Sequence, residues 1–353
     1  MHSFRRQFYL LPVIWVLVLG STVSVRAQDA HFSQYYSSAL YLNPSMAGVY
    51  PGPTFSSNYR SQWGSIAVPY TTSQISLIMP LYAKREFDDA HLGGLGLSVY
   101  NDRAGDGNLK TTGINFNAAY NLPLSANRMQ SLIFGVQGGF IQKNIDFANL
   151  QWGEQYNPYL GDFDQSITPN ESNIRTRATY PDVGAGLMYY YNAGRNFEEK
   201  GLSGYLGFSA YHLNRPNESM ISGMVSNLPM LFKAHAGVEF KVGQKVNFSP
   251  NLLVMQQGDF RLFNGGAYLT YQFLDQRKYL APSDVIFGAW YRLKDSFIFA
   301  VGFGNQSYTL GFSYDYNNST LRANTGGRGA YEISLVLTKI KEKRIRRFYT
   351  PRI

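Results

Sequence analysis

The segment that most constrains the fold is Tyr331–Thr338, because its residues alternate in polarity over eight positions. Tyr331, Ile333, Leu335 and Leu337 alternate with Glu332, Ser334, Val336 and Thr338. A period of two predicts a β-strand with one face against an apolar medium and the other against a polar one. The same alternation recurs along the chain. It predicts an all-β fold, a transmembrane antiparallel β-barrel of the outer-membrane type.

The N-terminus has the features of a secretory signal peptide. Arg5 and Arg6 precede the apolar run Phe8–Gly20, and a small residue, Ala27, precedes an expected cleavage at Gln28. We therefore expect residues 1–27 to direct export and to be too short to span a membrane as a helix. The chain has no Cys, which excludes disulfides, a lipoprotein anchor and metal sites built on thiolates.

The composition favours a membrane barrel over a soluble β-protein. The chain has 27 Tyr, 24 Phe and 34 Gly. Barrels place aromatic residues at the two membrane interfaces and use glycine where strands bend or pack closely. A soluble β-sandwich or solenoid would bury a second set of apolar residues, and the alternating strands lack one.

Fourteen strands can be counted, an even number, as in single-chain bacterial barrels. They are expected at residues 54–62, 72–79, 94–100, 111–120, 132–142, 182–191, 204–211, 231–241, 246–255, 261–273, 285–291, 297–304, 308–316 and 330–338. The three longest connections then fall on one side, the cell surface, although residues 81–92 are long for a periplasmic turn. We expect Leu335 and Phe312 to face lipid, and Glu332 and Asp315 to face a lumen filled with water.

Residues 28–50 precede the first strand and do not alternate, although they are rich in aromatic and apolar side chains. Such a segment is not expected to hang free in the periplasm, because its apolar side chains favour burial. We predict a plug in the periplasmic mouth of the barrel or a partner-binding segment. Its candidate contact residues are Phe32, Tyr35, Asn43, Pro44 and Gly48.

The excess positive charge lies in the last 15 residues. The chain has 32 Lys+Arg and 23 Asp+Glu; the signal peptide holds three Arg, and residues 339–353 hold seven basic residues and one acid, so residues 28–338 carry 22 of each. Such a tail on an exported protein does not indicate nucleic-acid binding. It predicts either a solvated end that meets anionic headgroups or a periplasmic docking peptide. The candidate docking residues are Lys341, Lys343, Arg344, Arg346, Arg347 and Phe348.

No motif predicts catalysis, a cofactor or a metal. Ser209, His212 and Asn214 could suggest an outer-membrane phospholipase, and Asp88, Asp89 and His91 an outer-membrane protease, but a catalytic site is recognised by geometry and not by adjacency. Gly93–Gly96 lacks the following helix of a phosphate loop, so strand glycines are expected. The acids of Asn101–Gly107 could bind calcium or belong to a hairpin loop.

Several segments, in order, resemble the PorP/SprF family of outer-membrane proteins. They are His31–Tyr36, Tyr41–Gly48, Tyr59–Trp63, Trp152–Tyr156, Tyr211–Ser219, Ser313–Tyr316 and Gly329–Leu335. The resemblance implies an outer-membrane component of the Bacteroidota type IX secretion system. Implied partners are other secretion components or a large secreted adhesin, as in gliding motility. A passive channel for hydrophobic or small solutes is the alternative. The expected organisation is a signal peptide (1–27), a plug or partner segment (28–50), a barrel (51–338) and a basic periplasmic tail (339–353).

Overall fold

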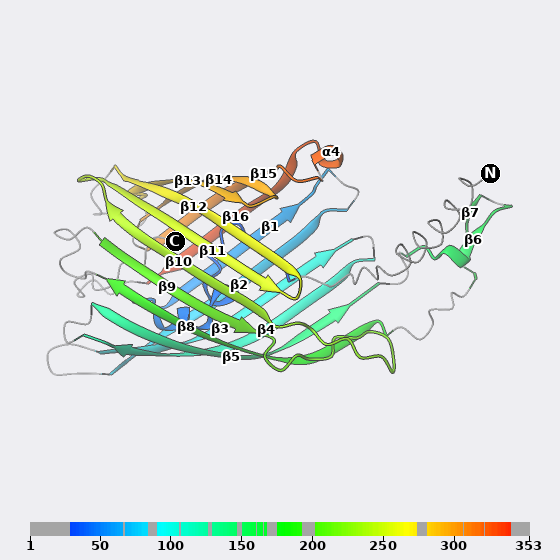
Figure 1. The fold of residues 1–353 in the computed structure, drawn as a ribbon, viewed down its shortest axis with the longest axis horizontal. Coiled ribbons are helices and arrows are strands. Elements are labelled where there is room, and N and C mark those ends of the chain that lie inside the picture. The colour runs from blue at the N-terminus through cyan, green and yellow to red at the C-terminus, as the bar shows by residue number, and fades with distance from the viewer. Residues whose placement is uncertain are drawn as a thin grey trace, which may run out of the picture.

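Fourteen antiparallel strands close into a barrel (Figure 1). The computed structural model describes residues 29–339 except 66–67, 84–89, 106, 126–128, 147–149, 160, 165, 168–174, 193–201, 274–280, 306 and 321. The barrel strands are β1 (Thr54–Gln62), β2 (Tyr70–Ala83), β3 (Ala90–Ala104), β4 (Leu109–Pro123), β5 (Gln130–Asn144), β8 (Arg177–Asn192), β9 (Leu202–Tyr211), β10 (Leu231–Lys241), β11 (Val246–Gln257), β12 (Phe260–Gln272), β13 (Asp284–Arg292), β14 (Ser296–Gly304), β15 (Tyr308–Asn317) and β16 (Arg328–Thr338).

Each barrel strand pairs with the next one along the chain, and β1 pairs with β16 to close the barrel. The predicted count of fourteen strands is confirmed, and every predicted strand has a counterpart. A separate two-stranded hairpin, β6 (Tyr156–Asn157) and β7 (Asp162–Phe163), belongs to the connection between β5 and β8. It lies beyond one end of the barrel (Figure 1). No helix among the described residues is long and apolar enough to cross a membrane.

The two ends of the barrel differ in their connections. At the end called here the loop end lie the long connections β5–β8 and β9–β10, and the β15–β16 connection with the short helix α4 (Arg322–Thr325). The opposite end, the turn end, holds the start of β1 and the end of β16. Long loops face the outside in bacterial outer-membrane barrels. The predicted long turn at residues 81–92 is shorter than expected, because β2 and β3 extend to Ala83 and Ala90.

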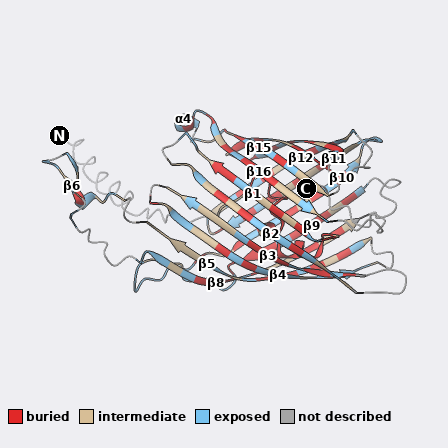
Figure 2. Ribbon diagram, turned by 180° about the vertical axis from the view of Figure 1, so that it is seen from behind, coloured by how far each residue is buried: buried red, intermediate tan, exposed pale blue. Residues whose placement is uncertain are grey.

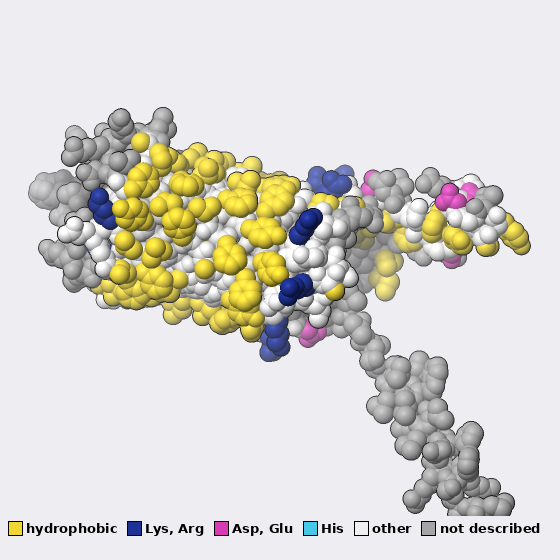
Figure 3. Space-filling model, turned by 90° about the horizontal axis from the view of Figure 1, so that it is seen from above, with side chains coloured by type: hydrophobic (Ala, Val, Ile, Leu, Met, Phe, Trp, Pro, Cys, Tyr) yellow, Lys and Arg dark blue, Asp and Glu magenta, His cyan; other side chains and the backbone are white. Residues whose placement is uncertain are grey.

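Side chains alternate between the outside and the inside of the barrel, as Figure 2 shows by burial. Outside, apolar side chains form a broad band (Figure 3). Phe312 is exposed and Leu335 half-buried on this surface, while Asp315 and Glu332 face inward, so the predicted facing is correct. The expectation that lumen water solvates the two acids is wrong. Asp315 is 2% and Glu332 0% exposed, because other residues of the chain surround them.

The surrounding residues belong to an N-terminal segment, residues 29–53, that lies inside the barrel. It contains the one-turn helix α2 (Ala39–Leu42) and the 3₁₀ helix η1 (Pro44–Gly48). Asp29 contacts His212, which follows β9 at the loop end, whereas Pro51 accepts a hydrogen bond from Tyr82 near the turn end. The segment therefore extends along the lumen and is not confined to the periplasmic mouth, where we expected it.

Candidate functional site in the barrel lumen

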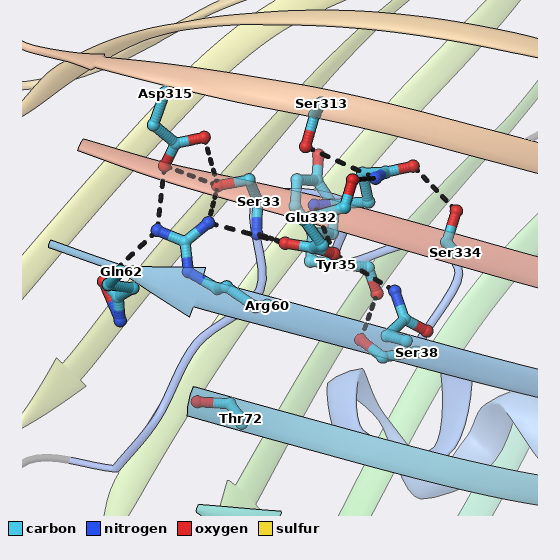
Figure 4. Close-up of polar contacts among 12 residues, drawn as sticks. Ser33, Tyr35, Ser38, Arg60, Gln62, Thr72, Ser313, Asp315, Glu332 and Ser334 are labelled. Atoms are coloured by element: carbon cyan, nitrogen blue, oxygen red, sulfur yellow. Dashed lines mark hydrogen bonds and ion pairs between the residues drawn. The ribbon is translucent and has the colours of Figure 1, made fainter. Parts of the chain in front are cut away.

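A buried charge cluster joins the N-terminal segment to the wall formed by β1, β13, β15 and β16. Figure 4 shows the part of the cluster on β1, β15 and β16. Arg60 Nη2 lies 2.8 Å from Asp315 Oδ2, and Arg60 Nη1 lies 3.5 Å from Glu332 Oε2. Arg292 Nη1 lies 3.1 Å from the same Asp315 oxygen. Two guanidinium groups thus face two carboxylates. The attraction within a buried ion pair offsets the cost of desolvation only when the geometry is good and hydrogen bonds satisfy the other polar atoms of the two groups.

Ser33 is the residue of the N-terminal segment that completes the cluster. Its hydroxyl donates to Asp315 Oδ2 at 2.8 Å and accepts from Arg292 Nη2 at 2.7 Å and from Arg60 Nη1. Its backbone N–H donates to Glu332 Oε2 at 2.7 Å. Four strands and the segment therefore share one polar network, and removing the Ser33 hydroxyl would take one hydrogen-bond partner from each of Asp315, Arg60 and Arg292.

Gln34 continues this attachment along β15 and β16. Its side-chain amide donates to the Glu332 carbonyl at 3.1 Å and accepts from Ser334 Oγ at 2.7 Å. The residue opposite is Gly311; a Cβ there would lie 2.3 Å from Gln34 Oε1. A glycine at this inward position makes room for the amide.

Asn43 fixes the middle of the segment to the opposite side of the lumen. It is the N-cap of η1: its Oδ1 accepts from the backbone N–H of Ser45 at 2.9 Å, and Pro44 occupies the first helical position. This is the usual capping chemistry. Its Nδ2 lies within hydrogen-bond distance of the carbonyls of Leu187 and Phe208 and of His235 Nε2. One buried side chain thus starts the helix and ties it to β8, β9 and β10.

Glycines on three strands, β3, β5 and β8, form the surface on which η1 rests. A Cβ at Gly94 would lie 2.0 Å from the Ala47 carbonyl oxygen, one at Gly135 2.2 Å from Ser45 N, and one at Gly186 1.9 Å from Asn43 Oδ1. No side chain fits at these distances. We call Gly94, Gly135 and Gly186 the glycine cradle; it lets the backbone of the segment approach the backbone of the wall.

At the loop end, His212 lies between two carboxylates. Its Nδ1 is 2.7 Å from Asp182 Oδ1, and its Nε2 is 2.7 Å from Asp29 Oδ2. Burial lowers the pKa of His212, but the charge of Asp29 and the hydrogen bonds to both acids outweigh it and raise the pKa to about 10. Burial raises the pKa of Asp29, but His212 outweighs it and brings that pKa to about 2. A protonated His212 therefore holds the start of the segment.

Lys233 of β10 contacts the N-terminal segment at Tyr41. Its Nζ donates to the Tyr41 carbonyl at 2.6 Å and lies 4.2 Å from the Tyr41 ring centre and 4.7 Å from that of Tyr211. Aromatic faces stabilise a buried ammonium group through their quadrupoles. A polar cavity opens beside it; its lining includes Asp29, Tyr100, Asn115, Gln137 and Lys233.

The structure brings together only part of the predicted contact set. Phe32, Tyr35, Asn43, Pro44 and Gly48 are all buried inside the barrel, against residues of the same chain. The predicted docking residues of the tail, Lys341, Lys343, Arg344, Arg346, Arg347 and Phe348, lie outside the described residues, as does the signal peptide. Sequence reasoning missed Arg60, Arg292 and Lys233. Each is a basic residue at an inward position of a strand, and Arg60 also lies in Tyr59–Trp63, one of the segments that resemble the PorP/SprF family.

The side chains of Ser209, His212 and Asn214 do not form a catalytic triad. Both ring nitrogens of His212 contact carboxylates, and the Ser209 hydroxyl donates to the Leu42 carbonyl at 2.8 Å. His91 is buried in β3, and Asp88 and Asp89 lie outside the described residues. The Asp102 carboxylate accepts from Thr72 Oγ1. Among the described residues, no group of three or more His, Asp and Glu side chains is placed to hold a metal ion.

A family comparison assigns the chain. The model of the family described as "Type IX secretion system membrane protein PorP/SprF" matches residues 24–337. The chain belongs to this family. PorP/SprF membership and the closed 14-strand barrel identify an outer-membrane protein of the type IX secretion system. No curated protein matches the chain.

Solved structures resemble this PorP/SprF barrel only loosely. The KdgM porin is 8% identical, with 81% of this chain and 99% of that chain covered and a TM-score of 0.37. The CymD monoaromatic hydrocarbon channel is 12% identical, with 86% and 93% covered and a TM-score of 0.43. A Pseudomonas aeruginosa FadL homologue is 11% identical, with 86% and 94% covered and a TM-score of 0.41.

Proposed function

We propose that this PorP/SprF protein is a non-enzymatic anchor: it holds a partner protein of the secretion system at the outer membrane. The observation that carries the proposal is the position of residues 29–53 inside the barrel, where the hydrogen bonds of Ser33 to a buried ion-pair cluster and the glycine cradle fix them. A barrel whose lumen holds part of its own chain so firmly is suited to bind partners at its two ends. We propose that this segment acts as a plug.

The partner at the cell surface is a secreted protein such as a large adhesin, and the loop end supports this choice. Tyr159 beside β7 is 97% exposed, and Met224 and Val225 of the β9–β10 connection are also exposed. Apolar side chains gathered on exposed loops are typical of protein-binding surfaces. At the turn end, the basic tail is proposed to meet a periplasmic component of the same system, with charge setting the rate of encounter.

Cross-linking in the native envelope tests the anchor. A photo-reactive residue at Tyr159 and, separately, one at Arg347 would be activated in cells, and the cross-linked proteins identified by mass spectrometry. We expect a secreted protein at Tyr159 and a periplasmic one at Arg347. A matched site on the lipid-facing surface, Phe312, is the control. Recovery of the same proteins from all three sites, or of none, contradicts the proposal.

The alternative is a passive channel for small solutes, and one observation favours it: a small cavity lies beside Lys233 and Asn115 and is lined also by Asp29 and His212 at the loop end. A channel would require the segment to move. Wild-type protein in planar bilayers should then conduct without a partner. We expect conductance only when the segment is displaced by substitution.

A further inference from the structure

The long strands of the barrel carry basic side chains in one row at the loop end. The register aligns Arg103 of β3 with Lys110 of β4, Lys110 with Asn144 of β5, and Asn144 with Arg177 of β8. All four face outward: they share the parity of Val99, Ile114, Phe140 and Val183, which lie on the exposed surface. We call Arg103, Lys110 and Arg177 the basic row.

The basic row lies just beyond the apolar band. One step toward the barrel centre, the aligned outward residues are Asn101, Thr112, Gln142 and Thr179, and the next aligned set is Val99, Ile114, Phe140 and Pro181. The outer surface thus changes from apolar to hydrogen-bonding to cationic within about 14 Å along the strands. That order matches acyl chains, a polar headgroup and its charged groups.

The charges of the row are not compensated within the described chain. Arg103 and Lys110 are direct cross-strand neighbours, and like charges in this position destabilise a sheet. Among the described residues, neither makes an ion pair. Nearby Asp102 points inward to Thr72, and Glu218 pairs with Lys143. Arg177 Nε donates to Asn144 Oδ1 at 3.2 Å, which leaves its other donors available.

We propose that the basic row binds the phosphate groups of a phosphorylated glycolipid in the outer leaflet. The loop end faces outward, so the row lies at the level of that leaflet's headgroups. Phosphate oxygens accept charge-assisted hydrogen bonds from guanidinium and ammonium groups. The amides and hydroxyls of Asn101, Thr112, Gln142 and Thr179 lie where they can bond the sugar. The site is independent of the anchor function proposed above.

The test uses the purified full-length barrel in detergent and measures its binding to lipid A by the shift in thermal unfolding. Arg103→Gln/Lys110→Gln should weaken the affinity about thirtyfold, since two basic residues near an anionic surface are lost. The matched control is Arg261→Gln/Arg328→Gln, at the same rim. Their cross-strand partners are Gln256 and Tyr316, neither of them basic. The control should keep at least a third of the wild-type affinity.

Four ligands separate the sources of the anion. Lipid A with its phosphates should bind, and dephosphorylated lipid A should bind at least tenfold more weakly. Phosphatidylglycerol and inorganic phosphate should fail to compete with lipid A at the same phosphate concentration. Equal loss in the control double variant would show only a diffuse charged rim and overturn the proposal, as would tight binding of dephosphorylated lipid A. If a variant folds poorly, its folded fraction can be recognised because its electrophoretic mobility changes on heating. The lipid phosphorus bound to that folded fraction then gives a second readout.

Discussion

The N-terminal segment meets two walls of the barrel in different ways. On the side of β1 and β13–β16, Arg60, Arg292, Asp315 and Glu332 hold Ser33 by charge and hydrogen bonds. On the side of β3, β5 and β8, the glycine cradle holds η1 by close backbone contact. We call the first side the charged wall and the second the glycine wall. At the charged wall, specific ionic and hydrogen-bonding atoms position the segment, so a substitution there should strongly destabilise the protein. At the glycine wall, only the lack of room for a side chain positions the segment, so an added side chain should displace it.

The largest effect is expected at the charged wall. Asp315→Asn leaves two buried guanidinium groups facing one buried carboxylate, Glu332, and the exposed Asp295, which should lower the free energy of unfolding by about 3–5 kcal/mol. Leu335→Arg on the lipid face should cost about 2–4 kcal/mol near the midplane. Urea unfolding in lipid vesicles measures both. A cost below 1 kcal/mol for Asp315→Asn would mean that water reaches the cluster.

The sequence predicts this barrel well because alternation records which face each residue occupies. The predicted strands are too short where outward residues become polar, as at Asn101 and Thr179, because the alternation loses contrast beyond the lipid while strand pairing continues. The charge cluster could not be predicted. Arg60 and Glu332 are 272 positions apart, and nothing local distinguishes a luminal acid in water from one buried under another segment.

The next effect is expected at the glycine wall. Gly135→Ala would place a Cβ 2.2 Å from Ser45 N, which should cost about 1–3 kcal/mol by overpacking. We expect the segment to shift and the barrel to conduct in planar bilayers. Gly138→Ala is the control: it is in the same strand, is exposed, and its Cβ would meet nothing within 4 Å. Equal conductance of the two variants would refute the cradle.

Asn43 tests the junction between the two walls. Asn43→Ala removes the η1 cap and the bonds to the Leu187 and Phe208 carbonyls. Loss of an N-cap costs about 0.5–2 kcal/mol. Asn43→Asp keeps the acceptor of the cap but loses the amide donor, so it separates capping from tethering. Hydrogen exchange at residues 43–48 should rise in both variants if tethering dominates, and only in Asn43→Ala if capping does.

The last effect is a pH dependence at the loop end, where neither wall acts. His212, with its pKa raised to about 10, stabilises the attached state fully below its ordinary pKa of 6.5 and loses this contribution as pH rises through 10. Asp29, with its pKa lowered to about 2, contributes above 3.8 and loses this as pH falls through 2. The start of the segment should therefore be held most firmly between about pH 4 and 6.5.

This last prediction can be measured because the chain has no Cys. A single Cys at Ala30 would react with a maleimide only when the start of the segment leaves its site; rates are normalised to the thiolate fraction with a Cys at exposed Tyr159. We expect accessibility at position 30 to increase between pH 8 and 10. In His212→Gln, which cannot carry the charge, accessibility should be high and flat with pH. A wild-type profile equally flat would show that the charged wall at Ser33, and not His212, holds this end.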